Sequence, residues 1–121
     1  MPRAVLEDTR LHPAIRDTVE HLHIEVVHNV QAASMSNAVL VVGMAGNPFC
    51  KRARKALDAA AVSYHYLEYG SYLSRWRERL ALKMWSGWPT FPLVFVKGVL
   101  IGGADDLTKL IATGELKRLL A

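Results

Sequence analysis

The sequence has only one cysteine, Cys50, among its 121 residues. A single cysteine cannot form a disulfide within the chain, so the composition does not require an oxidising compartment. Long apolar runs are also missing, since no stretch approaches the roughly 20 residues that a membrane-spanning helix needs. The first residues carry charged side chains where a signal peptide has an apolar segment. We therefore expect a cytoplasmic protein with no membrane partner.

Acidic residues are fewer than basic ones, which gives a formal net charge of +4. The basic excess lies in two clusters, Lys51, Arg52, Arg54 and Lys55, then Arg75, Arg77, Arg79 and Lys83. Nucleic-acid-binding domains usually add aromatic platforms or a recognition motif to such clusters, and the sequence has neither. We therefore expect no nucleic-acid partner. The clusters are either exposed faces of two helices or a field that attracts a small anionic ligand.

Residues 1–36 are predicted to form an N-terminal helical extension. Pro13 suits the first turn of a helix. Apolar residues then follow at steps of three and four, which predicts one amphipathic helix of about 20 residues. The stripe consists of Ile15, Val19, Leu22, Val26 and Val30. Because an isolated helix of this length is marginal in water, the stripe must pack on its own domain or on a second copy of the chain.

Residues 37–121 predict one α/β domain. Ala38–Met44 is a short apolar run typical of a buried strand, and Val62–Tyr69 alternates between apolar and polar residues like a second strand. Lys51–Ala61 lies between them and has helical spacing, with an apolar face that begins at Phe49. A strand, a helix and a strand in this order place the two strands parallel.

The rest of the domain is predicted to add two helices and a hairpin before a last short helix. A helix over Ser71–Trp85 has an apolar stripe of Trp76, Leu80 and Met84. The later elements are strands over Leu93–Val96 and Val99–Ile101 around the turn Lys97-Gly98, a helix that Asp105 or Asp106 caps, and a helix over Glu115–Leu120.

The stretch Asn47-Pro48-Phe49-Cys50 joins the first strand to the helix that follows it. Backbone N–H groups at a helix start lack intrahelical partners, and their partial positive charge favours a thiolate or carboxylate. Cys50 is therefore a candidate nucleophile. The alternative is that Cys50 packs as a small apolar residue, because free cysteines are among the most often buried residues.

Three motifs resemble those of monothiol glutaredoxins, in the same order. Trp88-Pro89-Thr90-Phe91-Pro92 is similar to the family's W-P-T-x-P, and Gly102-Gly103-Ala104-Asp105-Asp106 to its G-G-x-D-D. Asn47-Pro48-Phe49-Cys50-Lys51 falls where that family has C-P-Y-C-K or C-G-F-S. The resemblance covers roughly residues 37–121. It implies a thioredoxin fold, with a four-stranded mixed sheet flanked by helices and, here, an N-terminal helical extension.

The resemblance also implies glutathione as ligand and cofactor. In the family, the residue before a cis-proline pairs its backbone with the cysteinyl part of glutathione, a role that falls to Phe91. Asp105 would meet the γ-glutamyl end at a helix start, and Arg79 the glycine carboxylate. The glutathione-binding residues implied in this way are Arg79, Thr90, Phe91, Pro92, Gly103, Ala104 and Asp105.

The sequence departs from the family at the nucleophile. Asn47 stands at that position, and an amide is neither a nucleophile nor a soft metal ligand. The lysine that the family carries shortly before it falls at Met44. Cys50 matches the second position of a C-x-x-C-like turn, where a thiol is normally more buried and less acidic. The resemblance therefore implies a glutathione-binding protein in thiol redox chemistry with a degenerate active site and weak or absent activity.

Three functions remain open at this point. As an enzyme, the protein would be a glutathione-dependent thiol-disulfide oxidoreductase with Cys50 as a substitute nucleophile. As an iron–sulfur carrier or assembly factor, a dimer would hold a [2Fe–2S] cluster with Cys50 thiolates and two glutathiones. As a non-catalytic module, it would use the cleft to bind peptides or client proteins.

Overall fold

A four-stranded mixed sheet forms the centre of the computed structural model, which describes residues 3–121. The strands β1 and β2 are parallel, and β3 is antiparallel to both of its neighbours, β1 and β4. Their order across the sheet is β2-β1-β3-β4, with β1 at Val39–Gly43, β2 at His65–Glu68, β3 at Leu93–Val96 and β4 at Val99–Gly102. This arrangement confirms the thioredoxin fold that the sequence predicts.

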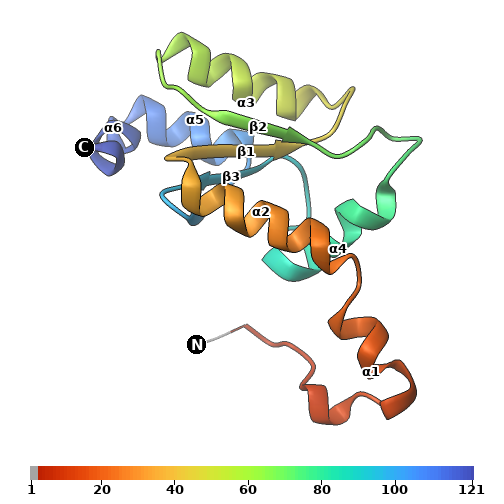
Figure 1. The fold of residues 1–121 in the computed structure, drawn as a ribbon. Helices are drawn as coiled ribbons and strands as arrows, with labels where there is room; N and C mark the ends of the chain where they lie inside the picture. The colour runs from red at the N-terminus through yellow and green to blue at the C-terminus, as the bar shows by residue number, and fades with distance from the viewer. Residues whose placement is uncertain (1–2) are drawn as a thin grey trace.

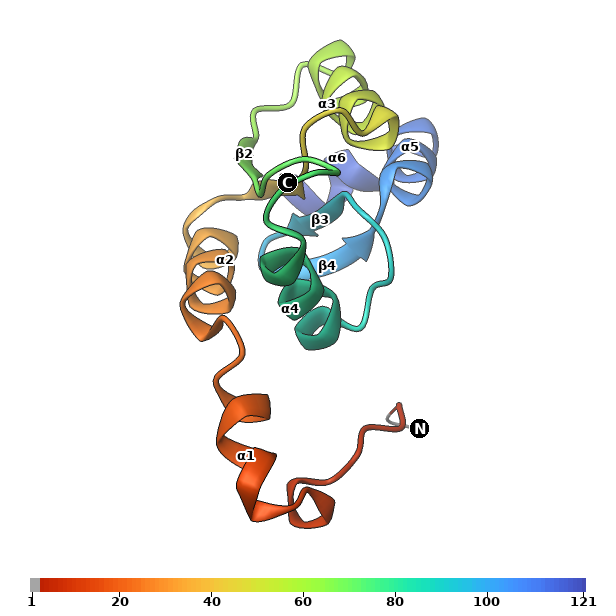
Figure 2. The ribbon, with the colours of Figure 1, turned by 90° about the vertical axis from the view of Figure 1, so that its right-hand side faces the viewer.

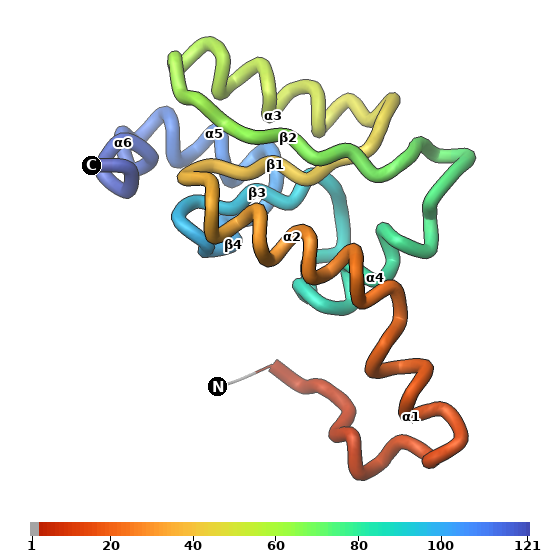
Figure 3. Tube along the Cα trace, in the orientation of Figure 1, coloured from red at the N-terminus to blue at the C-terminus, as the bar shows by residue number. Residues whose placement is uncertain are grey.

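Helices cover both faces of this sheet (Figure 1). Helices α3 and α5 pack together on one face, and α2 and α4 pack together on the other (Figure 2). The helices are η1 (Asp8–Arg10), α1 (Pro13–Glu20), α2 (Ile24–Ser36), α3 (Pro48–Ala59), α4 (Trp76–Ser86), α5 (Ala104–Ala112) and α6 (Glu115–Leu120). The trace in Figure 3 shows that the chain before α2 reaches away from the sheet; residues 3–23 are called the N-terminal arm below.

The central strand β1 supplies two cores. All of its residues are buried, as expected for a strand that is covered on both faces. Leu40 and Val42 belong to the core beneath α2 and α4, whereas Val39 and Val41 belong to the core beneath α3 and α5. Because successive side chains of a strand point to opposite faces, this short apolar run fixes both layers of helices.

The turn between β3 and β4 has the geometry that its two residues favour. Lys97 and Gly98 both have positive φ angles, 49° and 82°. Two-residue hairpin turns whose central residues both have positive φ match the twist of the flanking strands. The hairpin predicted from Lys97-Gly98 is therefore present.

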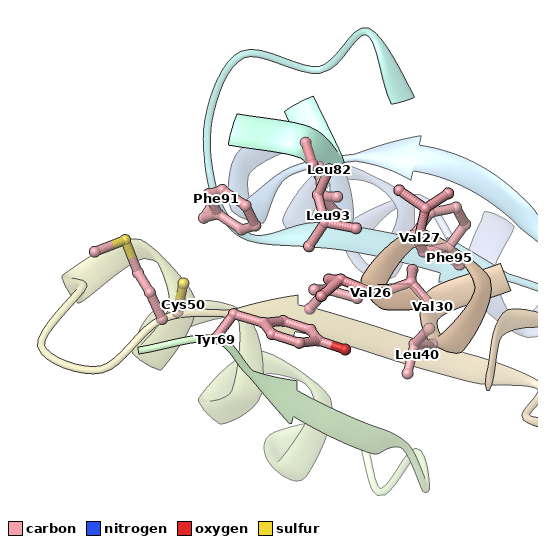
Figure 4. Packing of buried hydrophobic residues seen from close by; sticks show 13 residues of the cluster. Val26, Val27, Val30, Leu40, Cys50, Tyr69, Leu82, Phe91, Leu93 and Phe95 are labelled. Atoms are coloured by element: carbon pink, nitrogen blue, oxygen red, sulfur yellow. The ribbon is translucent and has the colours of Figure 1, made fainter. Parts of the chain in front are cut away.

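The single N-terminal helix predicted from the apolar stripe is wrong, because two helices occupy this segment. The break lies at residues 21–23, where His23 adopts a left-handed conformation with φ 44°. The two halves of the stripe then differ. Val26, Val27 and Val30 of α2 are buried against the sheet (Figure 4), whereas α1 has no buried residue. Within the stripe, Val26 and Val30 therefore lie in the core and Leu22 packs against it, whereas Ile15 and Val19 are exposed.

Helix α4 turns a different face inward from the one its apolar stripe suggested. Trp76 and Met84 are 56% and 54% exposed, whereas Ala81 and Leu82 are buried. The helix also begins at Trp76 rather than near Ser71. The preceding residue, Arg75, has a left-handed backbone, which separates the loop from the helix.

Candidate functional site

Asn47 caps helix α3. Its Oδ1 accepts hydrogen bonds from the backbone N–H groups of Phe49, at 2.8 Å, and Cys50, at 3.1 Å. Asparagine is a favoured N-cap because its side chain satisfies donors that have no partner within the helix. The residue at the nucleophile position thus stabilises the helix and occupies two N–H groups that could otherwise have faced an anion.

The thiol of Cys50 is buried at the end of the sheet. The residue is 2% exposed and lies in the core with Met44, Tyr69 and Phe91 (Figure 4). A Cβ built on Gly43 would come within 2.8 Å of its Sγ, so the thiol packs directly against the backbone of β1. Burial raises the pKa of Cys50 above its ordinary value and outweighs the opposite effect of a backbone hydrogen bond from Met44. A reactive thiol needs the opposite surroundings, exposed and electropositive.

A cavity of about 480 Å³ lies beside the start of α3, toward β2. Its lining includes Asn47 and carries charge of both signs from Lys51, Arg54 and Glu68. The hydroxyl of Tyr66 donates a 2.9 Å hydrogen bond to Glu68 Oε1, and the guanidinium of Arg54 lies 4.1 Å from the centre of the Tyr66 ring. The lining therefore carries two basic side chains and one acidic one.

A second cavity, of about 220 Å³, lies where the starts of α3 and α5 meet the loop before β3. It brings together five of the residues that the motifs singled out, Thr90, Phe91, Gly103, Ala104 and Asp105. The neighbouring Phe91–Pro92 peptide bond is cis, and Pro92 is buried behind this wall. Segments far apart in the sequence thus form one concave surface.

The start of α5 presents backbone donors to this second cavity. Gly103 has no side chain with which to cap the helix, and the carboxylate of Asp106 accepts from the Gly103 N–H at 3.0 Å. The N–H groups of the first turn, from Ala104 on, lack acceptors within the helix, and the helix dipole adds partial positive charge there. A carboxylate or phosphate is the group that such a helix start binds.

Gly102 makes this arrangement possible. Its φ angle is +119°, which glycine adopts without strain. A Cβ at this position would overlap with the carboxylate of Asp106. The glycine before the helix therefore lets Asp106 fold back onto the Gly103 N–H.

Arg79 lines neither cavity. The residue is 7% exposed, and its Nη1 donates to the backbone carbonyls of Tyr69, at 2.9 Å, and Ser74, at 2.6 Å. These bonds satisfy a charged group that would be costly to bury alone. The guanidinium therefore holds the loop between β2 and α4. The resemblance had instead implied that Arg79 binds the glycine carboxylate of glutathione.

Three further residues line the second cavity, Phe49, Trp88 and Asp106. Phe49 was expected on the buried face of α3, but it is 48% exposed and forms a wall of the cavity, with the Arg52 guanidinium 4.9 Å from its ring centre. Arg52 Nη1 also lies 3.7 Å from Asp105 Oδ1. Trp88 and Asp106 belong to the recognised motifs, which could have identified them. Arg52 was indicated only as one member of a basic cluster.

The buried Trp88 Nε1 has no hydrogen-bond partner among residues 3–121. It lies beside Gly103, where a built Cβ would come within 3.5 Å of Nε1. The wall of the second cavity therefore holds one buried N–H group that has no acceptor among the described residues.

The surroundings of Cys50 do not fit an iron–sulfur cluster. Cluster ligands are thiolates that reach the metal, whereas this thiol is buried and its pKa is raised. Across residues 3–121, no group of three or more His, Cys, Asp or Glu side chains could hold a metal ion. No helix in the same part of the chain is long and apolar enough to cross a membrane.

Comparisons with known proteins match this fold and these motifs. The glutaredoxin family model matches residues 39–101. A glutaredoxin-like protein of Dictyostelium discoideum is 45% identical over 102 residues, which are 84% of this chain and 83% of that protein. Glutaredoxin 4 of Haemophilus influenzae is 33% identical over 81% of this chain and 94% of its own length. The crystal structure of a buckwheat glutaredoxin–glutathione complex aligns with a TM-score of 0.72 and 28% identity, covering 84% of this chain and 91% of that one.

Proposed function

Because the chain belongs to the glutaredoxin family, we propose that it binds glutathione and acts in thiol redox chemistry with weak or absent catalytic turnover. The observation that carries this proposal is the second cavity, where the start of α5 and the Phe91–Pro92 loop meet the start of α3. The solved buckwheat relative forms a glutathione complex, which supports the same ligand here.

Glutathione would lie across this cavity. The γ-glutamyl carboxylate would accept from the N–H groups at the start of α5, and its amino group would face the Asp105 carboxylate. The backbone of Phe91 would pair with the cysteinyl part, as an added strand does. The Arg52 guanidinium, 3.7 Å from Asp105, gives the cavity a cation that a second carboxylate of the ligand could reach.

Catalysis is the part of the family's chemistry that this chain supports least. Asn47 cannot attack a disulfide, and its side chain already holds the Phe49 and Cys50 N–H groups. Cys50 is buried as a neutral thiol. The iron–sulfur alternative is therefore not part of the proposal, and a non-catalytic binding module is the second candidate that the capped α3 start favours.

The proposal is tested by assaying glutathione-dependent reduction of a small mixed disulfide. The full chain and Cys50→Ser should both reduce it at rates close to the uncatalysed background, because neither offers an accessible thiolate. Turnover like that of an ordinary glutaredoxin, abolished by Cys50→Ser, would show Cys50 to be a working nucleophile and overturn the degenerate-site part of the proposal.

A further inference from the structure

Gly43 ends strand β1 and leaves an open place on the face of the sheet that α3 covers. In the parallel register of β1 and β2, Val41 lies opposite Tyr66, and Gly43 lies opposite Glu68. Residues two apart along a strand point to the same face, so Tyr66 shares a face with Gly43. Because Gly43 has no side chain, the long side chain of Tyr66 can reach across to its backbone.

The thiol of Cys50 and the hydroxyl of Tyr66 occupy this place together. A Cβ built on Gly43 would lie 2.8 Å from Cys50 Sγ, 3.0 Å from Tyr66 Oη and 3.1 Å from Cε1 of the same ring. These atoms fill the volume that a side chain at position 43 would take. The buried thiol therefore has the phenol of Tyr66 as a near neighbour.

Two contacts hold the ring of Tyr66 in this position. Its hydroxyl donates to Glu68 Oε1 at 2.9 Å, and the guanidinium of Arg54 lies 4.1 Å from the centre of the ring. A cation over an aromatic face is attracted by the ring quadrupole. Glu68 belongs to β2, whereas Arg54 belongs to α3, the helix that carries Cys50. The ring is therefore held by both of the elements that lie beside the thiol.

The thiol and the ring meet at the wall of the cavity of about 480 Å³ beside the start of α3. Cys50 and Tyr66 both line this cavity, yet Cys50 is only 2% exposed. A small reagent that enters the cavity must therefore pass a side chain to reach Sγ. The cavity shares no lining residue with the proposed glutathione cavity, and no described residue of the N-terminal arm lines it.

The surroundings of the thiol also favour its neutral form. Burial is the largest cause of the raised pKa of Cys50, and the Glu68 carboxylate adds to it, whereas the Arg54 guanidinium acts in the opposite direction. Burial also raises the pKa of Tyr66, so its hydroxyl stays protonated and bonded to Glu68 at neutral pH. The titratable side chains that line the cavity or share the core with the thiol are Lys51, Arg54, Tyr66, Glu68 and Tyr69.

We propose that Tyr66 keeps Cys50 unreactive, because its ring closes the path from the cavity beside the start of α3 to Sγ. Removing the ring should admit small electrophiles and water to the sulfur. This role goes beyond the proposed function, since it assigns the low reactivity of the thiol to a side chain outside the glutathione cavity. It does not require glutathione to bind.

The test is the rate at which iodoacetamide alkylates the full chain, followed by mass spectrometry. Cys50 is the single cysteine, so a rapid adduct reports on this thiol. Tyr66→Ala should react at least about tenfold faster than the wild type, because the thiol becomes accessible. Tyr66→Phe keeps the ring and should stay within about threefold of the wild-type rate.

Tyr64→Ala is the matched control. Tyr64 packs against the same core as Tyr66 but does not line the cavity. This variant should react like the wild type. Equal rates for Tyr64→Ala and Tyr66→Ala would overturn the proposal, and so would a Tyr66→Phe variant as fast as Tyr66→Ala.

The dependence of the rate on urea separates an opened cavity from unfolding. Alkylation that requires unfolding rises steeply with urea, because the free energy of unfolding falls linearly with its concentration. Alkylation of Tyr66→Ala through the opened cavity should stay nearly constant below the unfolding transition. A steep rise across the same range would show that the variant exposes its thiol by unfolding, and it would overturn the proposal.

The titration of the thiol gives a readout that a loss of stability alone would not change. The ultraviolet absorbance of the thiolate is followed with pH, each variant against the same variant carrying Cys50→Ser. The wild type and Tyr64→Ala should titrate above the ordinary 9.0. Tyr66→Ala should titrate at a pH lower by about 0.5 or more, because water reaches the sulfur. An unchanged midpoint in Tyr66→Ala would contradict a covering role for the ring.

Discussion

Helices α3 and α5 begin at the same cavity, yet their first turns are satisfied in different ways. At α3, the side chain of Asn47 accepts from two N–H groups of the first turn. At α5, Gly103 offers no capping side chain, and Asp106 bonds the Gly103 N–H just outside the helix. One helix start is therefore closed by the chain itself, and the other keeps donors for a ligand.

This difference separates binding from chemistry. A thiolate at the start of α3 would need the N–H groups that Asn47 occupies, together with a position more exposed than that of Cys50. A carboxylate at the start of α5 needs only the free donors and Asp105. Under the proposed function, a capped start of α3 beside an open start of α5 is the pattern expected of a binding cleft without a nucleophile.

The largest effect should come from opening the start of α3 to a thiol. In Asn47→Cys, the new thiol would lie at the helix start, where cysteine pKa values fall to about 3.5–7.5. Relative to a thiol with the ordinary pKa of about 8.5, one with a pKa of about 6.5 carries roughly 25-fold more thiolate at neutral pH. Reduction of a glutathione mixed disulfide should rise by a similar factor.

Two controls accompany this substitution. Adding Met44→Lys supplies a nearby cation and should raise the rate a second time. Asn47→Ser removes the amide but offers no thiol, and it should stay at the wild-type rate. An Asn47→Cys variant as inactive as Asn47→Ser would mean that the start of α3 is not the site of thiol chemistry.

The next effect concerns the start of α5. Asp105→Ala should weaken glutathione binding by roughly 1.5–3 kcal/mol, because the ligand loses a charge-assisted hydrogen bond. Calorimetry with reduced glutathione measures the change. Asp58→Ala, also exposed and acidic but outside the cavity, is the matched control and should bind like the wild type. Equal affinities for the two variants would remove Asp105 from the site.

A smaller effect should follow from removing the cap of α3. Asn47→Ala leaves the Phe49 and Cys50 N–H groups without their acceptor, which should lower the free energy of unfolding by about 1 kcal/mol. Urea unfolding measures the loss. Asn29→Ala, on the exposed side of α2, should change stability by no more than about 0.5 kcal/mol. Loss of the same size in both variants would argue against the cap.

The smallest effect is a dependence of stability on pH. Burial raises the pKa of the Cys50 thiol above its ordinary 9.0, so the unfolded chain releases this proton first as the pH rises. The stability that the buried neutral thiol contributes is therefore complete below that value and lost above it. Between about pH 8 and about pH 9.5, the unfolding free energy of the wild type should fall by up to about 0.8 kcal/mol more than that of Cys50→Ala. Parallel pH profiles would contradict a buried neutral thiol.

The sequence predicted the sheet well, because its strands and turns depend on local signals. Alternation along the strands, the Lys97-Gly98 turn and the Trp88–Pro92 motif each fix short segments. Cys50 matches the second cysteine position of a C-x-x-C-like turn, which predicted a buried thiol, and the structure has the residue buried.

The sequence patterns did not predict contacts between segments that are far apart in the sequence, or breaks in a regular helix. Arg79 is buried only because the Tyr69 and Ser74 carbonyls accept its protons, which no helical period reveals. The break at His23 depends on a left-handed residue inside an otherwise regular stripe. Phe49 follows the helical period but faces a cavity that the distant loop and α5 create.

The central claim is that the cleft binds glutathione without a covalent bond to the chain. The most direct measurement is calorimetric titration of the wild type with reduced glutathione and with S-methylglutathione, whose sulfur cannot form a disulfide. The account predicts saturable binding of both at millimolar concentration with the same affinity, because Asn47 provides no thiol. No heat of binding from either ligand at millimolar concentration would contradict it.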